Sequence, residues 1–140
     1  MSHEIEEGIV ERLDFDKLGK VAACGQALLP VVVQHADTQE VLVVAYANRE
    51  ALTRTLKDRV AVFWSSSRNE LWIKGATSGD YLDLVDVRVN CEQNSLLYIV
   101  RPRGVGGCHT KGADGKNRMS CYYRRIVGDG ILDWVKERLQ

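Results

Sequence analysis

The sequence has no apolar run close to the ~20 residues that a membrane-spanning helix requires, so no membrane partner is expected. Its acidic start, MSHEIEEG, lacks the basic and then apolar order of a secretory signal. Proline and glycine together make up only 14 of the 140 residues, which argues against a disordered or collagen-like chain. Net charge is absent because 19 basic and 19 acidic residues cancel, which disfavours a nucleic-acid partner. We therefore expect one folded, cytoplasmic domain that covers residues 1–140.

Charge is uneven along the chain even though it cancels overall. Residues 1–20 are mainly acidic, whereas residues 101–125 carry seven bases against the single acid Asp114. These bases are Arg101, Arg103, Lys111, Lys116, Arg118, Arg124 and Arg125. Such a segment is either a solvated surface loop or a pocket for phosphates, which arginine binds through paired hydrogen bonds and lysine as a point charge.

The four cysteines include no Cys-x-x-Cys pair, which argues against a zinc ribbon or zinc knuckle. In a cytoplasmic protein, cysteines are more often buried, metal-bound or catalytic than disulfide-bonded. Cys91, Cys108 and Cys121 flank or lie within the basic segment, and His109 follows Cys108 directly. Spacing alone leaves both metal binding and a place in the core open for these three, whereas Cys24 is expected to be a small buried residue.

Hydrophobic periodicity predicts an α+β fold with mainly antiparallel strands and a few helices. Alternating or β-branched runs predict strands over residues 29–34, 40–46, 60–66, 70–74, 81–90, 95–101 and 122–127. Helical spacing predicts helices over residues 4–13, 48–57 and 131–139. We expect Asn48 to cap the second helix and the third to turn Trp134, Val135 and Leu139 inward.

A loop of nineteen residues, 102–120, separates the last two predicted strands. Loops of this length without secondary structure of their own are uncommon in small domains and are usually functional or disordered. This one holds Cys108, His109 and most of the basic residues. If the protein is an enzyme, its active site is expected there.

Several long motifs follow one another: LPVVVQ…EVLVVAYANREAL, FWSSSRNELWIKGATSG, a strand ending in Cys91, and CHT…SCYYR. From about Leu28 to Arg125 the sequence resembles the phosphoribosyl-AMP cyclohydrolase family, and the motif WSxSRxxLWxKGxTSG is long and specific. The resemblance implies hydrolysis of the adenine ring of 1-(5-phosphoribosyl)-AMP at the N1–C6 bond, the third step of histidine biosynthesis. It also implies a homodimer with its site at the subunit interface, zinc held by three cysteines drawn from both subunits, and bound magnesium.

By this resemblance Cys91, Cys108 and Cys121 are the zinc ligands, and His109, next to Cys108, is the candidate catalytic residue by its chemistry. Three thiolates leave one position of a tetrahedral zinc open for water. Their negative charge weakens the polarisation of that water, so a nearby imidazole that titrates near neutrality is a valuable proton acceptor. The motif also supplies seven candidate substrate-binding residues: Trp64, Arg68, Trp72, Lys74, Thr77, Ser78 and Gly79. By residue type alone, the tryptophans could equally be core and Arg68 a surface residue.

The resemblance breaks down around Cys91. The family motif there reads Asp-Cys-Asp-x-Asp, with acids that are taken to bind magnesium, whereas this chain reads Asn90-Cys91-Glu92-Gln93-Asn94. Magnesium depends on carboxylate oxygens in near-octahedral geometry, and only Glu92 supplies one. We therefore expect magnesium binding at Asn90, Glu92 and Asn94 to be weak or absent.

A second departure is the interval between Cys108 and Cys121, which is longer than the family's usual connection and adds no obvious ligand. The departures keep two other interpretations open. One retains the zinc but opens or deaminates a different phosphorylated purine-like ring. The other is a non-catalytic nucleotide-binding dimer with structural zinc; His109 argues against it, since a structural site needs no proton carrier. In each case the expected partner is a small phosphorylated nucleotide.

Overall fold

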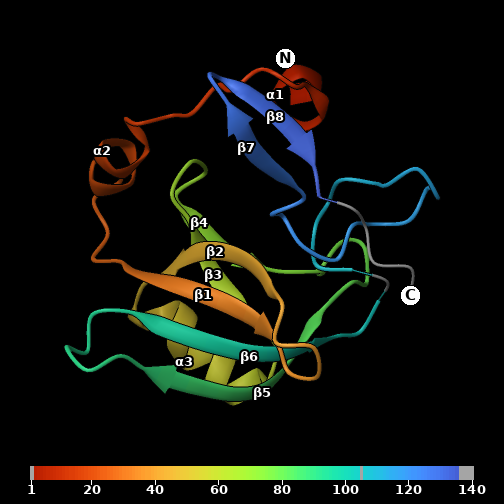
Figure 1. Cartoon of the computed structure of the whole chain (residues 1–140). Coiled ribbons are helices and arrows are strands. Elements are labelled where there is room, and N and C mark those ends of the chain that lie inside the picture. The colour runs from red at the N-terminus through yellow and green to blue at the C-terminus, as the bar shows by residue number, and fades with distance from the viewer. Residues whose placement is uncertain (1, 105, 136–140) are drawn as a thin grey trace.

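The computed structural model describes residues 2–104 and 106–135, and over these residues the chain forms three helices and eight strands (Figure 1). The elements are, in order, α1 (Ser2–Glu7), α2 (Lys17–Ala22), β1 (Leu29–His35), β2 (Val41–Ala47), α3 (Arg49–Asp58), β3 (Val62–Ser65), β4 (Glu70–Ile73), β5 (Leu82–Val89), β6 (Leu96–Pro102), β7 (Arg124–Gly128) and β8 (Ile131–Trp134). The predicted α+β class with mainly antiparallel strands is confirmed. No helix among these residues is long and apolar enough to cross a membrane.

The main sheet has the strand order β2-β1-β6-β5. The β1–β2 and β5–β6 pairs are antiparallel hairpins, as the alternating sequence predicts, but β1 and β6 pair in parallel. The parallel pair joins segments about sixty residues apart in the sequence, so Val31 lies opposite Leu96. One face of this sheet buries Val31, Val33 and Tyr98 completely.

Helix α3 and the small β3–β4 sheet cover the core beside the main sheet (Figure 1). Asn48 caps the helix as predicted, since its side chain accepts a hydrogen bond from the amide of Ala51 at 2.9 Å. Thr55 is fully buried and ties the helix to β3: its hydroxyl donates to the Ala51 carbonyl and accepts from the Val62 amide, at 2.9 Å in both cases. This packing fixes the starting point of the β3–β4 hairpin.

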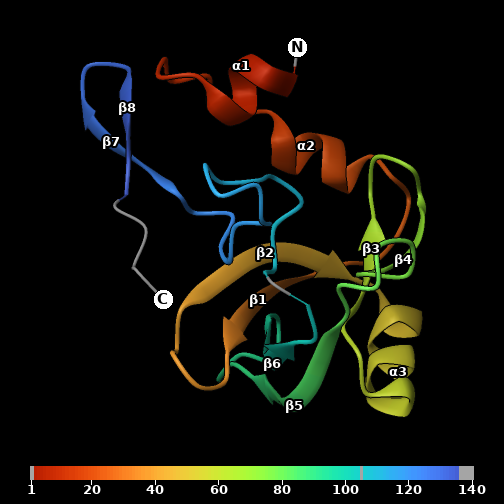
Figure 2. The ribbon, with the colours of Figure 1, turned by 90° about the vertical axis from the view of Figure 1, so that its right-hand side faces the viewer.

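The β7–β8 hairpin and the N-terminal segment form a second structural unit, which stands apart from the main sheet in Figure 2. Val10 pairs with Ile131, and the Glu11 amide donates to the Gly130 carbonyl at 2.7 Å. Stacking of Tyr123 on Trp134, with ring centroids 5.5 Å apart, links the hairpin to the chain that follows Cys121.

The predicted helix over residues 131–139 is wrong. Residues 131–134 form β8, and residues 136–140, including Leu139, lie outside the described residues. Gly130, with φ +70°, reverses the chain into a hairpin, and strand pairing with β7 replaces helix formation. Trp134 and Val135 are 37% and 42% exposed, so neither is turned into the core as expected.

The predicted helix over residues 4–13 stops at Glu7, and the short helix α2 has no counterpart among the predicted elements. Gly8 follows the end of α1, and its amide bonds the Glu4 carbonyl at 3.1 Å. Beyond it the chain extends so that Val10 can pair with β8, which overrides the apolar spacing of Ile9, Val10 and Leu13.

Candidate active site

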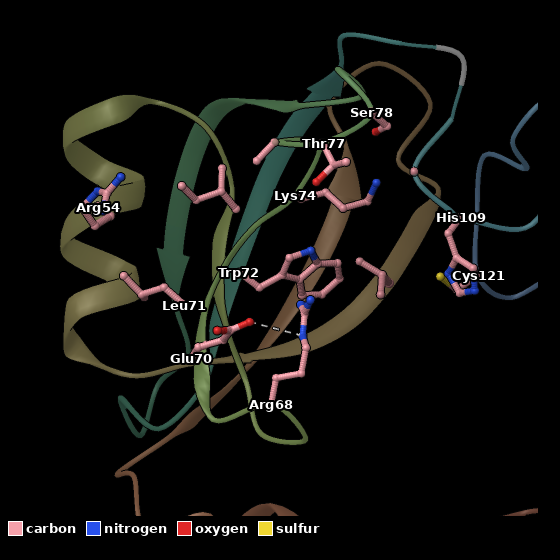
Figure 3. Close-up of a pocket in the computed structure, with 15 residues that line it drawn as sticks. Arg54, Arg68, Glu70, Leu71, Trp72, Lys74, Thr77, Ser78, His109 and Cys121 are labelled. Atoms are coloured by element: carbon pink, nitrogen blue, oxygen red, sulfur yellow. Dashed lines mark ion pairs between the residues drawn. The ribbon is translucent and has the colours of Figure 1, made fainter.

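A pocket of about 470 Å³ opens between the β3–β4 hairpin, the loop that follows it, and the segments around residues 107 and 121 (Figure 3). Seven of the residues predicted from the sequence line it: Arg68, Trp72, Lys74, Thr77, Ser78, His109 and Cys121. Segments far apart in the sequence therefore meet at one cavity.

Two residues predicted at the substrate are not among those that line the pocket. Trp64 is half-buried and its indole nitrogen donates to Asn69 Oδ1 at 3.2 Å. Gly79 closes a turn with φ +85°, and its amide bonds the Gly75 carbonyl at 2.7 Å. Arg54, which projects from α3, lines the pocket and was not predicted, because helical spacing carries no sign of a pocket beside that helix.

The loop after β4 contributes one buried cation, Lys74, to the lining of the pocket. Lys74 is only 9% exposed, and its backbone amide is bonded to the Ala61 carbonyl at 3.3 Å. Gly75 has φ +91°, and a Cβ atom there would overlap the backbone of Tyr81, so only glycine fits this turn. In Figure 3 the Lys74 side chain extends toward the side on which His109 and Cys121 lie.

The opposite wall comes from two chain segments that lie side by side. Cys108 donates its amide to the Arg118 carbonyl at 3.0 Å, and the Arg118 amide bonds the Thr110 carbonyl at 2.9 Å. Cys121 is tied to the main sheet through its amide and the Leu42 carbonyl, at 2.7 Å. The chain between Cys108 and Cys121 therefore folds back on itself and brings these two cysteines together.

The thiols of Cys108 and Cys121 interact and shift each other's pKa in opposite directions. The hydrogen bond from Cys121 lowers the pKa of Cys108 to about 5, helped by the Thr110 hydroxyl, 3.0 Å from Cys108 Sγ. The same hydrogen bond, together with burial and the Cys108 charge, raises the pKa of Cys121, which the Lys74 ammonium partly offsets. One thiolate is therefore ready at neutral pH, in the microenvironment that soft metal ions and electrophiles favour.

Cys91 lies outside this pair. It is exposed in the turn between β5 and β6, whereas Cys108 follows the other end of β6. At about 3.3 Å per residue, the seven-residue strand separates these ends by roughly 20 Å. Within the described part of one chain, no three His, Cys, Asp or Glu side chains are grouped to hold a metal. The thiol pair suits zinc, but the donor set of a single chain is incomplete.

The side chains of Asn90 and Asn94 form hydrogen bonds within the turn between β5 and β6. Asn90 Oδ1 accepts from the amides of Asn94 and Ser95, both at 2.9 Å, and Asn90 Nδ2 donates to Asn94 Oδ1 at 2.7 Å. Both amide oxygens are thus engaged within the turn, and Glu92 offers the one carboxylate. This arrangement does not fit a magnesium site.

None of the seven bases of residues 101–125, all of them in the described part of the chain, lines the pocket. Arg101 pairs with Asp37 at 2.9 Å and lowers the pKa of that carboxyl, and Arg103 pairs with Asp83. The cations that do face the pocket are Arg54, Arg68 and Lys74. A phosphate would therefore be bound by the β4 side of the pocket rather than by the basic loop.

His109 is exposed and its Nε2 lies 2.5 Å from Glu6 Oε2. The sequence gives no sign of this contact, because Glu6 is 103 residues away in the chain and belongs to an acidic terminal stretch without a motif. An imidazole, a thiol pair and a buried ammonium around one pocket, carried on an α+β scaffold, are the groups of an enzyme site.

Comparison with known proteins assigns the class. The sequence model of the phosphoribosyl-AMP cyclohydrolase family matches residues 43–123. A phosphoribosyl-AMP cyclohydrolase of Caulobacter vibrioides is 43% identical over 131 residues, 93% of this chain and 84% of its own length. The enzyme of that name from Archaeoglobus fulgidus is 43% identical over 119 residues, 85% of this chain and 96% of its own length. The chain belongs to the phosphoribosyl-AMP cyclohydrolase family and is a hydrolase that acts on carbon–nitrogen bonds.

Proposed function

We propose that this protein hydrolyses the N1–C6 bond of the adenine ring in 1-(5-phosphoribosyl)-AMP, a step of histidine biosynthesis. The observation that supports this most strongly is the meeting of Lys74, His109 and Cys121 at one pocket, all within the segment that the family model matches. In the reaction the oxygen of water bonds to C6, and N1 leaves with a proton.

The pocket residues divide into binding and proton-transfer groups. Trp72 presents an indole on which a purine ring can stack, and Lys74, with the hydroxyls of Thr77 and Ser78, donates to a phosphate. His109 is the group that can take the proton from water, because it is the pocket's imidazole. Arg68 lies at the other side of Trp72 in Figure 3, where it suits the second phosphate of this substrate.

We further propose that zinc is held by Cys108 and Cys121 of one chain together with Cys91 of a second copy, which makes a homodimer the functional unit. This arrangement accounts for a thiol pair at the pocket and for an exposed third thiol on a distant turn. When bound, zinc supplies a Lewis acid that lowers the pKa of water. With Asn90 and Asn94 engaged in their turn, magnesium binding is proposed to be weak.

An ultraviolet assay of ring opening tests the proposed function. The zinc-loaded protein should open 1-(5-phosphoribosyl)-AMP, and removal of zinc by a chelator should abolish turnover. Loss of magnesium alone should change the rate little. Turnover of another phosphorylated purine in place of this one would redirect the substrate assignment, and zinc binding without any turnover would contradict the enzymatic role.

A further inference from the structure

Helix α1 lies beside the loop that carries His109, and one of its carboxylates reaches that imidazole. The Glu6 Oε2 atom is 2.5 Å from His109 Nε2. The Glu6 side chain is 31% exposed, whereas that of His109 is 76% exposed. Glu6 is not among the residues that line the pocket; it contacts the pocket through His109, and its charge also raises the pKa of Cys121.

Four successive residues of this segment are held by the chain on either side of Cys121. Tyr123 Oη donates to the Glu6 carbonyl at 2.7 Å, and Arg124 donates to the carbonyls of Ile5 and Gly8. Arg118, whose side chain is 8% exposed, binds both oxygens of Glu7 at 2.7 and 3.1 Å. The backbone of Glu6 is therefore fixed on both sides relative to the segment that carries Cys121.

We propose that Glu6 is a positioning residue for His109. A carboxylate can only accept a hydrogen bond, so the bond to Glu6 places the proton of the neutral imidazole on Nε2. The Nδ1 atom is then the bare nitrogen, and it is the one that takes a proton from water. The role of His109 in this inference rests on the proposed function, whereas the Glu6 contact does not.

The fixed backbone distinguishes this pair from an incidental surface ion pair. Exposed pairs contribute little because two long, free side chains must be ordered to form them. Here Tyr123 and Arg124 have already ordered the main chain of Glu6, so the contact restrains the exposed His109 ring rather than the reverse. By comparison Glu4, on the same helix, pairs with Arg12 at 3.3 Å between two exposed side chains. Glu4 is therefore the matched control.

Measuring the tautomer of the His109 imidazole tests its contact with Glu6 directly, without any substrate. Two-bond proton–nitrogen correlations on the zinc-loaded protein, at about pH 8 where a free imidazole is neutral, report which nitrogen of His109 carries the proton. The chain has three histidines, so His35→Gln and His3→Gln assign the signals. The wild type and Glu4→Gln should hold the proton on Nε2, and Glu6→Ala should shift the ring toward a mixture. A proton on Nδ1 in the wild type would overturn the inference.

Steady-state kinetics test whether the contact between Glu6 and His109 contributes to catalysis. Glu6→Gln should lower kcat about ten- to hundredfold, the usual effect of losing a partner that orients a reacting group, with KM within about twofold. Glu6→Asp should recover part of this loss in kcat. Tyr123→Phe should lower kcat a few-fold, because it removes the hydrogen bond that holds the Glu6 carbonyl. Glu4→Gln should match the wild type.

The two sets of outcomes separate this inference from the proposed function. A wild type that opens the ring while Glu6→Gln retains the full kcat would overturn the inference and leave the function standing. A wild type without turnover would overturn the function, and the tautomer measurement would still decide whether Glu6 orients His109.

Discussion

At the residue scale, the chemistry centres on the thiol pair of Cys108 and Cys121. Cys108 is buried and Cys121 half-buried, and the pKa of Cys108 is lowered while that of Cys121 is raised. Two adjacent thiols that have not both ionised release a further proton when a divalent metal binds. The pair is therefore well suited to a soft cation.

Substitution of single cysteines tests which thiols bind the metal. Cys91→Ser, Cys108→Ser and Cys121→Ser should each lose zinc, because a serine hydroxyl is a far weaker ligand than a thiolate. Metal analysis of the purified proteins should give about one zinc per chain for the wild type. Cys24→Ser is the control and should keep its zinc, and full zinc in Cys121→Ser would remove that residue from the site.

The turn at Asn90 makes a prediction about magnesium. Replacing both Asn90 and Asn94 by aspartate brings two carboxylates together where the amides now bond at 2.7 Å, and a hard cation relieves their repulsion. Calorimetry should show magnesium binding for the double variant that is at least about tenfold tighter than for the wild type. Tight binding and a strict magnesium requirement in the wild type would contradict the account of this turn.

At the element scale, one hydroxyl joins α3 to β3. Thr55→Val keeps the shape of the side chain but leaves the buried Val62 amide without its partner, so the free energy of unfolding should fall by about 1–3 kcal/mol. Urea denaturation measures this loss. The exposed Thr53 of the same helix is the control, and Thr53→Val should change stability by less than about 0.5 kcal/mol. Equal effects at the two positions would show that the hydroxyl does not join these elements.

The turn after β4 can be tested with two glycines of similar backbone conformation. Gly75 and Gly79 have φ +91° and +85°, but a Cβ atom overlaps the Tyr81 backbone only at Gly75. Gly79→Ala should lose about 1–2 kcal/mol of stability from backbone strain. Gly75→Ala should lose clearly more in the same denaturation experiment, because the backbone must also move. A smaller loss at Gly75 would contradict the described packing.

The strands were largely predictable from the sequence because alternation is a local signal. The hairpin over residues 29–46 and the strands before and after Cys91 are confirmed. The error over residues 131–139 came from apolar spacing that fits either a helix or a strand. The dipeptide Asp129-Gly130, a strong hairpin signal, could have decided between them. The parallel pairing of β1 with β6 was not predictable, because it depends on contacts distant in sequence.

The candidate site was predictable only as far as its motifs reach. The continuous motif led to Trp72, Lys74 and Thr77, which the structure brings to the pocket. Glu6 and Arg54 lie outside the quoted motifs, so only the folded chain reveals them at the site.

At the scale of the whole molecule, the chain exposes apolar side chains along its N-terminal segment. They are Ile5, Ile9, Val10, Leu13, Phe15 and Leu18, and Phe15 is 89% exposed. Exposed apolar side chains that gather into one patch mark a surface for another protein, and this segment is the candidate. A second copy is the occupant proposed here, because the thiol pair of one chain lacks a third donor. Sedimentation at micromolar concentration should show a dimer, and a monomer with intact zinc would contradict the shared site.

Mixing two variants tests the shared site most directly. Cys91→Ser keeps the thiol pair, Cys121→Ser keeps the exposed third thiol, and each alone should bind no zinc and open no ring. After unfolding and refolding together with zinc, half of the dimers should be mixed, each with one complete site of two. The mixture should therefore recover about a quarter of wild-type zinc and ring-opening activity. Recovery of neither would contradict a site built from two copies of the chain.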